Sequence, residues 1–263
     1  MSQSTARVAP GLAALLESVI DYAGVFPPAG LSVNVATVNY DNYKKSEYAW
    51  MLRWLVVNEA GLEGVPAEHR NCVSLLAEAG RPGVAAIESK SLVAVGGAEA
   101  PVYCEVGFDN LNQLDAIKKS GCYAKMRTGG LKPEAIPSAG QVAEFINRCA
   151  DLELPFKATA GLHHPLRSMQ ALTYEADAPQ AVMHGFINVL MASAFAWQGA
   201  TDLEPILNEM DPQAFKFDDD AYWRGRPITR KQIIDMRANL MHSIGSCSFD
   251  EPVQDLRALG LFA

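Results

Sequence analysis

The chain alternates between short apolar runs, often β-branched, and longer segments of helical period, and this alternation constrains its fold more than any other feature. Such alternation is typical of α/β proteins with a parallel sheet. Eight runs predict strands, namely Val19–Phe26, Leu52–Val57, Cys72–Ala77, Val102–Val106, Cys122–Arg127, Phe156–Ala160, Phe215–Asp218 and Ile244–Phe249. We therefore expect a single-domain (β/α)8 barrel of the TIM type over residues 1–263, with a doubly wound open α/β sheet as the alternative.

Helices are predicted where apolar period and capping residues agree. After Ser138, an N-cap residue, apolar side chains recur at helical spacing as far as Ala150. Thr229 can cap a second helix in the same way. Further helices are predicted at Leu111–Lys119, Gln180–Gln198 and Pro252–Leu259. The run Ser91–Val95 is followed by two glycines and is interpreted as a hairpin or edge piece.

Composition and charge narrow the class of protein. Hydrophobic residues make up 49% of the chain and charged residues 20%, which is typical of globular proteins and excludes wholesale disorder. The net charge of −8 argues against a nucleic-acid partner. Apolar stretches fall short of the ~18 residues of a membrane helix, and the first residues do not resemble a signal peptide. With five cysteines and no CxxC pair, these features predict a cytoplasmic protein without a membrane partner.

Charged residues interrupt several predicted strands, although a strand buried on both faces is normally apolar. They are Arg53, Glu105, Lys125, Arg127, Lys157, Lys216 and Asp218, and most lie near the end of their strand. A buried charge costs several kcal/mol unless it is paired. Because active sites of barrels lie at the carboxyl ends of the strands, we expect these residues to form a site. An interior ion-pair network that only stabilises the barrel is the alternative.

Small residues follow at the predicted strand ends. They are Thr128, Gly129 and Gly130 after Arg127, Thr159 and Gly161 after Lys157, and Gly245 and Ser246 in the last strand. Glycines let backbone N–H groups approach a ligand, and successive N–H groups bind anions. With Arg127, the lysines and Asp218, they predict a pocket for a small substrate that carries a carboxylate or phosphate. Tight turns are the alternative interpretation of the glycines.

Two adjacent histidines, His163 and His164, follow the Lys157 strand in the segment FKATAGLHHPLR. Either could act as a general acid or base, because the unperturbed pKa of histidine is about 6.5. Neighbouring side chains of an extended chain point apart, so the pair is a poor metal site, and a structural role in the loop is the alternative. Asp21 could supply a carboxylate at the end of the first strand or cap a turn.

The segment Lys157–Gly161, KATAG, resembles the sixth-strand motif Lys-Thr-Ser-Thr-Gly of class I aldolases of the deoxyribose-phosphate aldolase type. The resemblance implies that Lys157 forms a Schiff base and that a second lysine on the next strand, matched by Lys216, lowers its pKa. Ala158 and Ala160 replace hydroxyl residues of that motif, and the FKFDDD context lacks its glycines. The motifs KATAGLHHP and GSCSFDEP, with KMRTGG and HGFINVL, are also similar to an uncharacterised bacterial family, which implies no activity.

A lysine attacks a carbonyl only when it is neutral, and a free lysine with a pKa of about 10.4 is almost wholly protonated at neutral pH. Burial and a neighbouring cation lower that pKa. Lys125 and Lys216, on the predicted strands to either side of Lys157, could supply the cation. We therefore expect a lyase of the aldolase type that acts on a small anionic carbonyl compound without a cofactor, with Glu105, Asp218 or a histidine moving the proton.

Two other functions are compatible with the same residues. A metal-dependent lyase, isomerase or hydrolase would use a divalent cation and the side chains of Glu105, His163, His164 and Asp218. A non-catalytic protein that binds a small molecule would tolerate Lys157→Met with little loss of stability. The apolar segment Gln180–Gln198 could form a homo-oligomer interface, although core packing explains its composition equally well.

Overall fold

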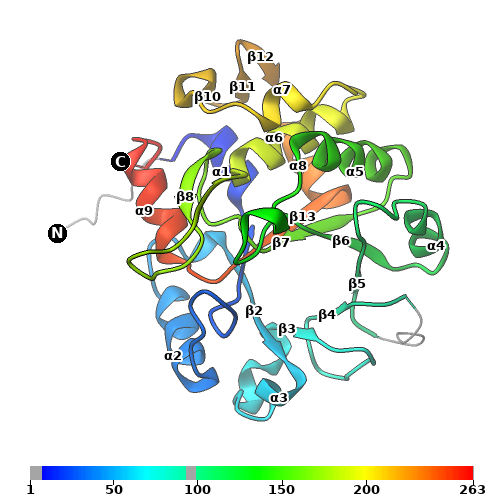
Figure 1. Ribbon diagram of the computed structural model, residues 1–263, viewed down its shortest axis with the longest axis vertical. Helices are drawn as coiled ribbons and strands as arrows, with labels where there is room; N and C mark the ends of the chain where they lie inside the picture. The colour runs from blue at the N-terminus through cyan, green and yellow to red at the C-terminus, as the bar shows by residue number, and fades with distance from the viewer. Residues whose placement is uncertain (1–7, 93–98, 263) are drawn as a thin grey trace.

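A computed structural model describes residues 8–92 and 99–262, in which eight parallel strands close into a barrel (Figure 1). Around the barrel the strands are β1 (Ile20–Tyr22), β2 (Leu52–Asn58), β3 (Val73–Leu76), β4 (Ala86–Ser89), β5 (Val102–Glu105), β6 (Tyr123–Arg127), β7 (Phe156–Thr159) and β13 (Met241–Ser246). Hydrogen bonding between β13 and β1 closes the ring. The barrel prediction is therefore confirmed, and the open-sheet alternative is wrong.

Helices surround the strands, with α5, α6 and α8 on one side of the ring in Figure 1 and α2 and α3 on the other. The α-helices are α1 (Pro10–Leu16), α2 (Val33–Tyr43), α3 (Glu59–Leu62), α4 (Gln113–Lys119), α5 (Ala139–Asp151), α6 (Phe186–Trp197), α7 (Glu204–Leu207), α8 (Arg230–Asn239) and α9 (Asp250–Ala258). Short 3-10 helices lie at Ala49–Met51, Ala67–Cys72, Pro133–Ala135 and Pro212–Ala214. No helix of the described residues has the length and apolar character needed to cross a membrane.

Capping residues begin the two helices that were predicted from them. Ser138 accepts a hydrogen bond from the backbone of Gln141, whose side chain accepts one from the backbone of Ser138. Thr229 and Gln232 form the same reciprocal pair at the start of α8. Each pair satisfies two backbone N–H groups that a helix start leaves without partners, which explains why both helix starts were predictable.

One predicted barrel strand is wrong, and one real strand was not predicted. Phe215–Asp218 contributes β10 (Phe215–Phe217), which forms a separate antiparallel sheet with β11 (Ala221–Trp223) and β12 (Arg226–Ile228) outside the ring. The fourth barrel strand is instead Ala86–Ser89, after the Gly80–Gly83 loop. Its length of four residues and its single β-branched side chain, Ile87, gave little strand signal. The predicted number of eight strands was thus right because two errors cancelled.

The predicted helix Gln180–Gln198 divides into two elements at Gly185. Its first part is strand β9 (Gln180–Met183), which pairs with β8 (Ser168–Ala171) in an antiparallel hairpin. The rest is α6, in which every residue except Trp197 is buried. Core packing therefore explains its apolar composition, and α6 leaves no free apolar face for a second copy. Part of the predicted hairpin Ser91–Val95 lies outside the described residues.

Candidate active site

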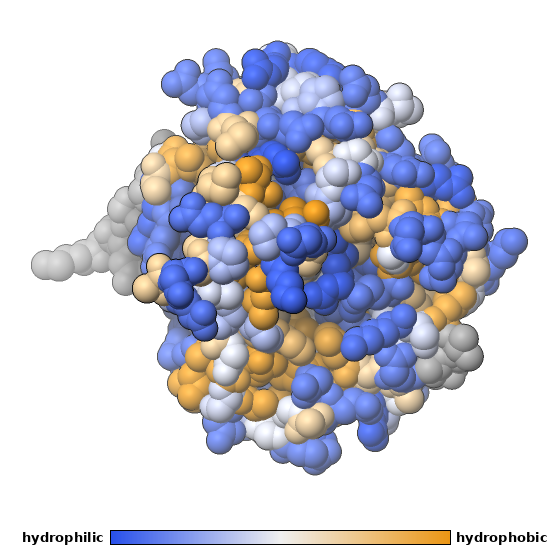
Figure 2. All heavy atoms as spheres, in the orientation of Figure 1, coloured by the Kyte–Doolittle hydropathy of each residue, from blue (hydrophilic) through white to orange (hydrophobic). Residues whose placement is uncertain are grey.

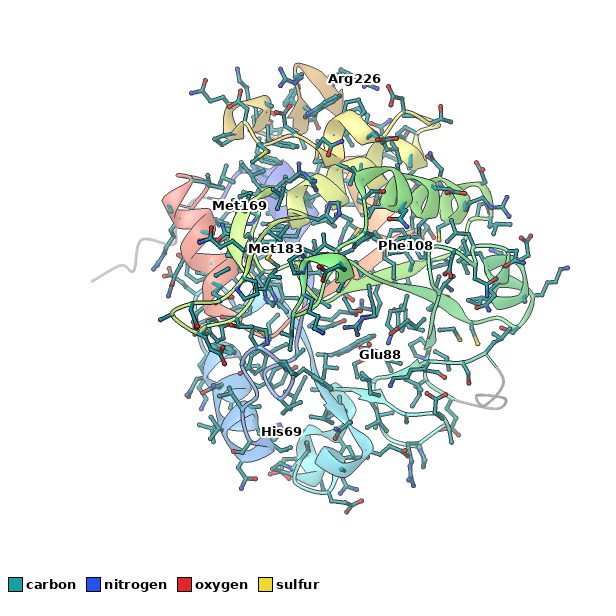
Figure 3. All side chains as sticks on the ribbon, in the orientation of Figure 1. His69, Glu88, Phe108, Met169, Met183 and Arg226 are labelled. Carbon is teal, nitrogen blue, oxygen red and sulfur yellow. The ribbon has the colours of Figure 1, made fainter. Side chains whose placement is uncertain are left out.

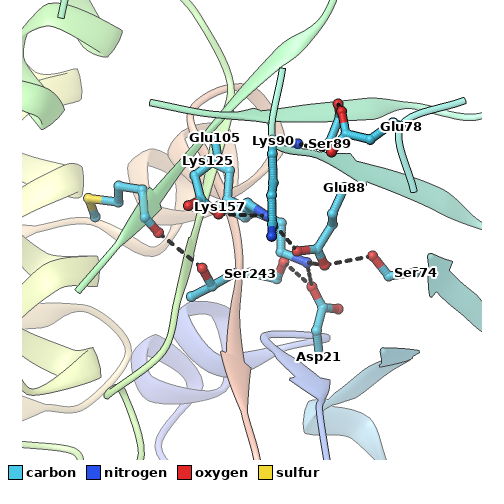
Figure 4. Close-up of polar contacts among 12 residues, drawn as sticks. Asp21, Ser74, Glu78, Glu88, Ser89, Lys90, Glu105, Lys125, Lys157 and Ser243 are labelled. Atoms are coloured by element: carbon cyan, nitrogen blue, oxygen red, sulfur yellow. Dashed lines mark hydrogen bonds and ion pairs between the residues drawn. The ribbon is translucent and has the colours of Figure 1, made fainter. Parts of the chain in front are cut away.

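Lys157 occupies the interior of the barrel between two carboxylates (Figure 4). Its Nζ donates to Asp21 Oδ2 at 2.5 Å and to Glu88 Oε1 at 2.6 Å. Lys157 and Asp21 have no solvent exposure, and Glu88 is 3% exposed. The three side chains come from β7, β1 and β4, so the ion pairs span the interior of the closed sheet. Lys157 therefore points inward, an orientation that the alternation along its strand left open because a shift of one residue in register would reverse it.

Lys125 lies beside Lys157, because these two residues are register partners on β6 and β7. Its Nζ is 3.1 Å from Glu105 Oε2 and 3.3 Å from Glu88 Oε2. Glu88 therefore bridges the two lysines with its two oxygens. We call Asp21, Glu88, Glu105, Lys125 and Lys157 the lysine–carboxylate network.

Two serine hydroxyls complete the polar contacts of the network. Ser243 Oγ donates to Asp21 Oδ2 at 2.6 Å, and Ser74 Oγ donates to Glu88 Oε1 at 2.8 Å. Both serines are fully buried. Within the described residues, Asp21 Oδ1 has no hydrogen-bond partner, so this carboxylate is held through one oxygen only.

The network fixes the charge of Lys157. Burial by itself would lower the pKa of Lys157, but the charges of Asp21 and Glu88 and the hydrogen bonds to them outweigh burial and raise it. Burial would likewise raise the pKa of Glu88, but Lys157 and Lys125 lower it to about 2. The prediction that neighbouring cations lower the pKa of Lys157 is therefore wrong, because two carboxylates lie closer to its amine.

A cavity of about 430 Å³ lies at the carboxyl ends of the strands, and we call it the carboxyl-end cavity. Of the network, Lys125 and Glu88 line it, whereas Lys157 lies deeper. Its other walls come from the loops after β1, β6, β7 and β13, and the β8–β9 hairpin contributes Met183. Figure 3 shows Glu88 within the ring of strands and Met183 on the hairpin. In the space-filling view, hydrophilic residues gather around the centre of this face (Figure 2).

Of the predicted substrate-binding residues, five line the cavity, three support its loops and Asp218 lies outside the ring of strands. Those that line the cavity are Arg127, Gly130, Thr159, Gly161 and Gly245. Arg127 is exposed and makes no ion pair within residues 8–92 and 99–262, so its guanidinium can bind an anionic group.

Three of the predicted residues support the loops of the cavity. Thr128 donates to the carbonyl oxygen of Ala160 at 2.6 Å. Gly129 and Gly161 lie against each other, and a Cβ on either would come within about 3 Å of the backbone of the other. Ser246 donates to the carbonyl oxygen of Ser248 at 2.6 Å. These contacts hold the loops after β6, β7 and β13 around the cavity.

Both predicted histidines line the cavity. Because the Ser246 hydroxyl donates to a carbonyl, its oxygen accepts from His163 Nδ1 at 2.9 Å, and this assignment leaves Nε2 of His163 as the basic nitrogen. Burial, with the neighbouring His164, lowers the pKa of His163 to about 4, so it is neutral at neutral pH. His164 pairs through Nδ1 with Asp255 Oδ2 at 2.6 Å.

Sequence reasoning included residues that lie elsewhere and missed residues that matter. Lys216 and Asp218 belong to the outer β10 sheet segment and are exposed, and the barrel strand that follows β7 in sequence, β13, carries no lysine. Glu88 was missed because its strand was missed. Cys247 lines the cavity 3.7 Å from His163 Nδ1, and burial raises the pKa of its thiol, which disfavours the nucleophilic thiolate.

The ligand set proposed for a metal does not come together. Asp218 lies outside the ring of strands, His164 pairs with Asp255, and Glu105 pairs with Lys125. Across the described parts of the chain, no three His, Cys, Asp or Glu side chains are grouped so that they could hold a metal ion.

Comparison of the chain with models of known protein families, with curated proteins and with solved structures finds no significant match. The function must therefore be argued from the geometry of the site itself.

Proposed function

We propose that the protein is an enzyme of the lyase class that acts on a small anionic carbonyl compound through a Schiff base on Lys125. The observation that carries the proposal is that Lys125 and Arg127 line the same cavity, which joins an interior amine to a guanidinium that makes no ion pair with the described residues. A carbonyl compound with a carboxylate or phosphate could bind Arg127 through its anionic group. Its carbonyl carbon would then face the amine two residues earlier on the same face of β6.

Lys125 suits the role of nucleophile better than Lys157, to which the aldolase resemblance pointed. Lys157 is enclosed by Asp21 and Glu88, and its raised pKa keeps it protonated and unreactive at neutral pH. Lys125 has access to the cavity, and Glu105, at 3.1 Å and with 24% of its side chain exposed, can accept its proton. Lys157 then acts as a positioning residue that keeps Glu88 ionised.

The reaction divides among these groups as follows. Lys125 gives a proton to Glu105 and adds as a neutral amine to the carbonyl carbon; return of that proton and loss of water give the iminium. In the cleavage direction, a base takes the proton of the β-hydroxyl group, the carbon–carbon bond breaks, and its electron pair passes into the iminium to give an enamine. His163 Nε2 lines the cavity as a neutral base for that proton.

Borohydride trapping tests the proposal. The protein is incubated with a panel of small aldehydes, keto acids and sugar phosphates, reduced, weighed intact and then digested to locate the modified lysine. We expect an adduct at Lys125 whose added mass is that of the carbonyl compound less one oxygen atom. It should be lost in Lys125→Met and retained in Lys231→Met, a matched control at an exposed lysine of α8.

Two results would contradict the proposal. An adduct at Lys157 would return the nucleophilic role to that residue. No adduct with any compound of the panel, in a protein that melts cooperatively, would exclude Schiff-base chemistry with these classes of substrate.

A further inference from the structure

A second cavity, of about 300 Å³, lies at the opposite end of the barrel. Its walls come from α1, the segment that leads into β1, the start of β2, α8 and the start of β13. The residues that line it are Ala14, Glu17, Ser18, Arg53, Ile234, Arg237, Ala238 and His242. We call it the arginine cavity, because Arg53 and Arg237 face it together.

The two arginines have unsatisfied donors. Arg53 Nη1 and Arg237 Nε and Nη1 are buried atoms without a hydrogen-bond partner within the described residues. Arg237 donates from Nη2 to the carbonyl oxygen of Glu17 at 2.9 Å, and the Arg53 guanidinium lies 3.8 Å from the centre of the Trp54 ring. Neither guanidinium is within ion-pair distance of a described carboxylate. A buried donor without a partner costs free energy, and the cost is larger for a charged group.

The groups around the arginine cavity leave its positive charge uncompensated. Burial, and then the neighbouring Arg53, lower the pKa of Arg237 to about 9, so the Arg237 guanidinium is still charged at neutral pH. His242 is neutral there, because burial and Arg53 lower its pKa to about 4. Its Nε2–H donates to the carbonyl oxygen of Ala238 at 3.2 Å, and its Nδ1 accepts from Tyr103 Oη at 2.7 Å. His242 therefore lines the cavity, but both of its ring nitrogens already make hydrogen bonds within the protein.

Glu17 is the acidic residue among the described residues that line the cavity. It contacts Arg237 through its backbone carbonyl, and its side chain is exposed. The cavity therefore combines two guanidiniums with a carboxylate that does not pair with them.

We propose that the arginine cavity is a binding site for a phosphate dianion, either free or as the phosphoryl group of a small metabolite, held between Arg53 and Arg237. A guanidinium presents its N–H donors in a planar fork that matches phosphate oxygens, and two guanidiniums balance two negative charges. Both arginines line the cavity, and neither has a described carboxylate to pair with, so a bound phosphate would supply the missing counter-charge. The site is separate from the carboxyl-end cavity, so this proposal does not depend on the Schiff-base function.

Calorimetric titration of the full chain with inorganic phosphate tests the site. We expect Arg53→Met and Arg237→Met each to weaken phosphate binding at least about tenfold, which corresponds to about 1.4 kcal/mol. Arg230→Met, a matched change at an exposed arginine of α8, should leave the affinity unchanged. Arg127→Met tests whether the titrated phosphate binds in the carboxyl-end cavity instead. If Arg237→Met does not fold, Arg53→Met carries the test.

Further titrants distinguish the source of the anion. Tighter binding of phenyl phosphate than of inorganic phosphate would assign the site to a phosphorylated metabolite, and the reverse would assign it to free phosphate. The proposal is overturned if phosphate binds equally to wild type and Arg53→Met, if only Arg127→Met weakens binding, or if acetate binds as tightly as phosphate. It is also overturned if millimolar phosphate gives no binding heat.

Discussion

Buried cations at the two ends of the barrel differ in whether they contact carboxylates. In the lysine–carboxylate network, Lys125 and Lys157 each contact two carboxylates. In the arginine cavity, Arg53 packs on an aromatic ring and Arg237 donates to backbone carbonyls, with no described carboxylate as ion-pair partner for either. Charge at the first end is balanced within the chain, whereas charge at the second end is available to a ligand. A buried cation thus indicates a binding site more strongly when its partners are missing than when they are present.

Removing one cation from each end tests whether the two ends differ in this way. Of the changes considered, Lys157→Met should have the largest effect on stability. Lys157→Met leaves Asp21 and Glu88 buried without their main partner, so we expect a loss of about 3–5 kcal/mol in the free energy of unfolding. Arg237→Met removes a charge that no described carboxylate balances, so we expect a change within about 1 kcal/mol. Urea denaturation at neutral pH measures both. Equal losses would show that the two ends do not differ.

The same experiment bears on the non-catalytic alternative, which allows Lys157→Met with little loss of stability. A loss below about 1 kcal/mol would favour that alternative, because the lysine would then not be needed to balance buried carboxylates. Lys231→Met, at an exposed position of α8, controls for the change of residue type.

Acid should weaken the lysine–carboxylate network through Glu88. The pKa of Glu88 is about 2 in the folded chain against an ordinary value of 4.5. A carboxylate with a lowered pKa contributes stability above its unfolded-state pKa, and that contribution is lost as the pH falls through 4.5 towards 2. We expect the difference in unfolding free energy between wild type and Glu88→Gln to shrink by on the order of 3 kcal/mol across this range.

Urea titrations of the two proteins at a series of acidic pH values measure that difference. His163 and His242, whose pKa values are lowered to about 4, also lose stability in acid, but both proteins retain them. Their contribution therefore cancels, and the remaining change belongs to Glu88. A difference that stays constant with pH would show that Glu88 is not held as a carboxylate.

The smallest effect concerns the serines that support the network. Ser74→Ala removes the hydroxyl that donates to Glu88 Oε1 at 2.8 Å. Because Lys157 and Lys125 continue to hold that carboxylate, we expect a loss of about 1 kcal/mol in the free energy of unfolding. Ser91→Ala, at a serine that contacts Glu78 outside the network, is the comparison variant. A loss as large as that of Lys157→Met would mean that the hydroxyl, and not the ion pairs, holds Glu88.

Much of the fold was predictable, because alternation and capping are local signals. The strands that carry Lys125 and Lys157 were both predicted, whereas their register, which turns both side chains into the barrel, is known only from the structure. Phe215–Phe217 has the same alternation but packs in an outer antiparallel sheet, and nothing local distinguishes the two situations.

The site was less predictable because its charges depend on partners far apart in sequence. Asp21 and Glu88 are separated from Lys157 by 136 and 69 positions, and together they reverse the expected change in its pKa. Arg53 was recognised as a charged residue of a predicted strand, but only the folded chain places it in one cavity with Arg237.

The contact between Gly129 and Gly161 has a consequence for how the sequence can diverge. A side chain at either position meets the main chain of the other, and no replacement at the second position can move that main chain away. Neither residue can therefore change first and be compensated later, as two packed side chains often can. We expect homologues that retain this pair of loops to carry glycine at both positions, while the cavity walls around them diversify to suit other substrates.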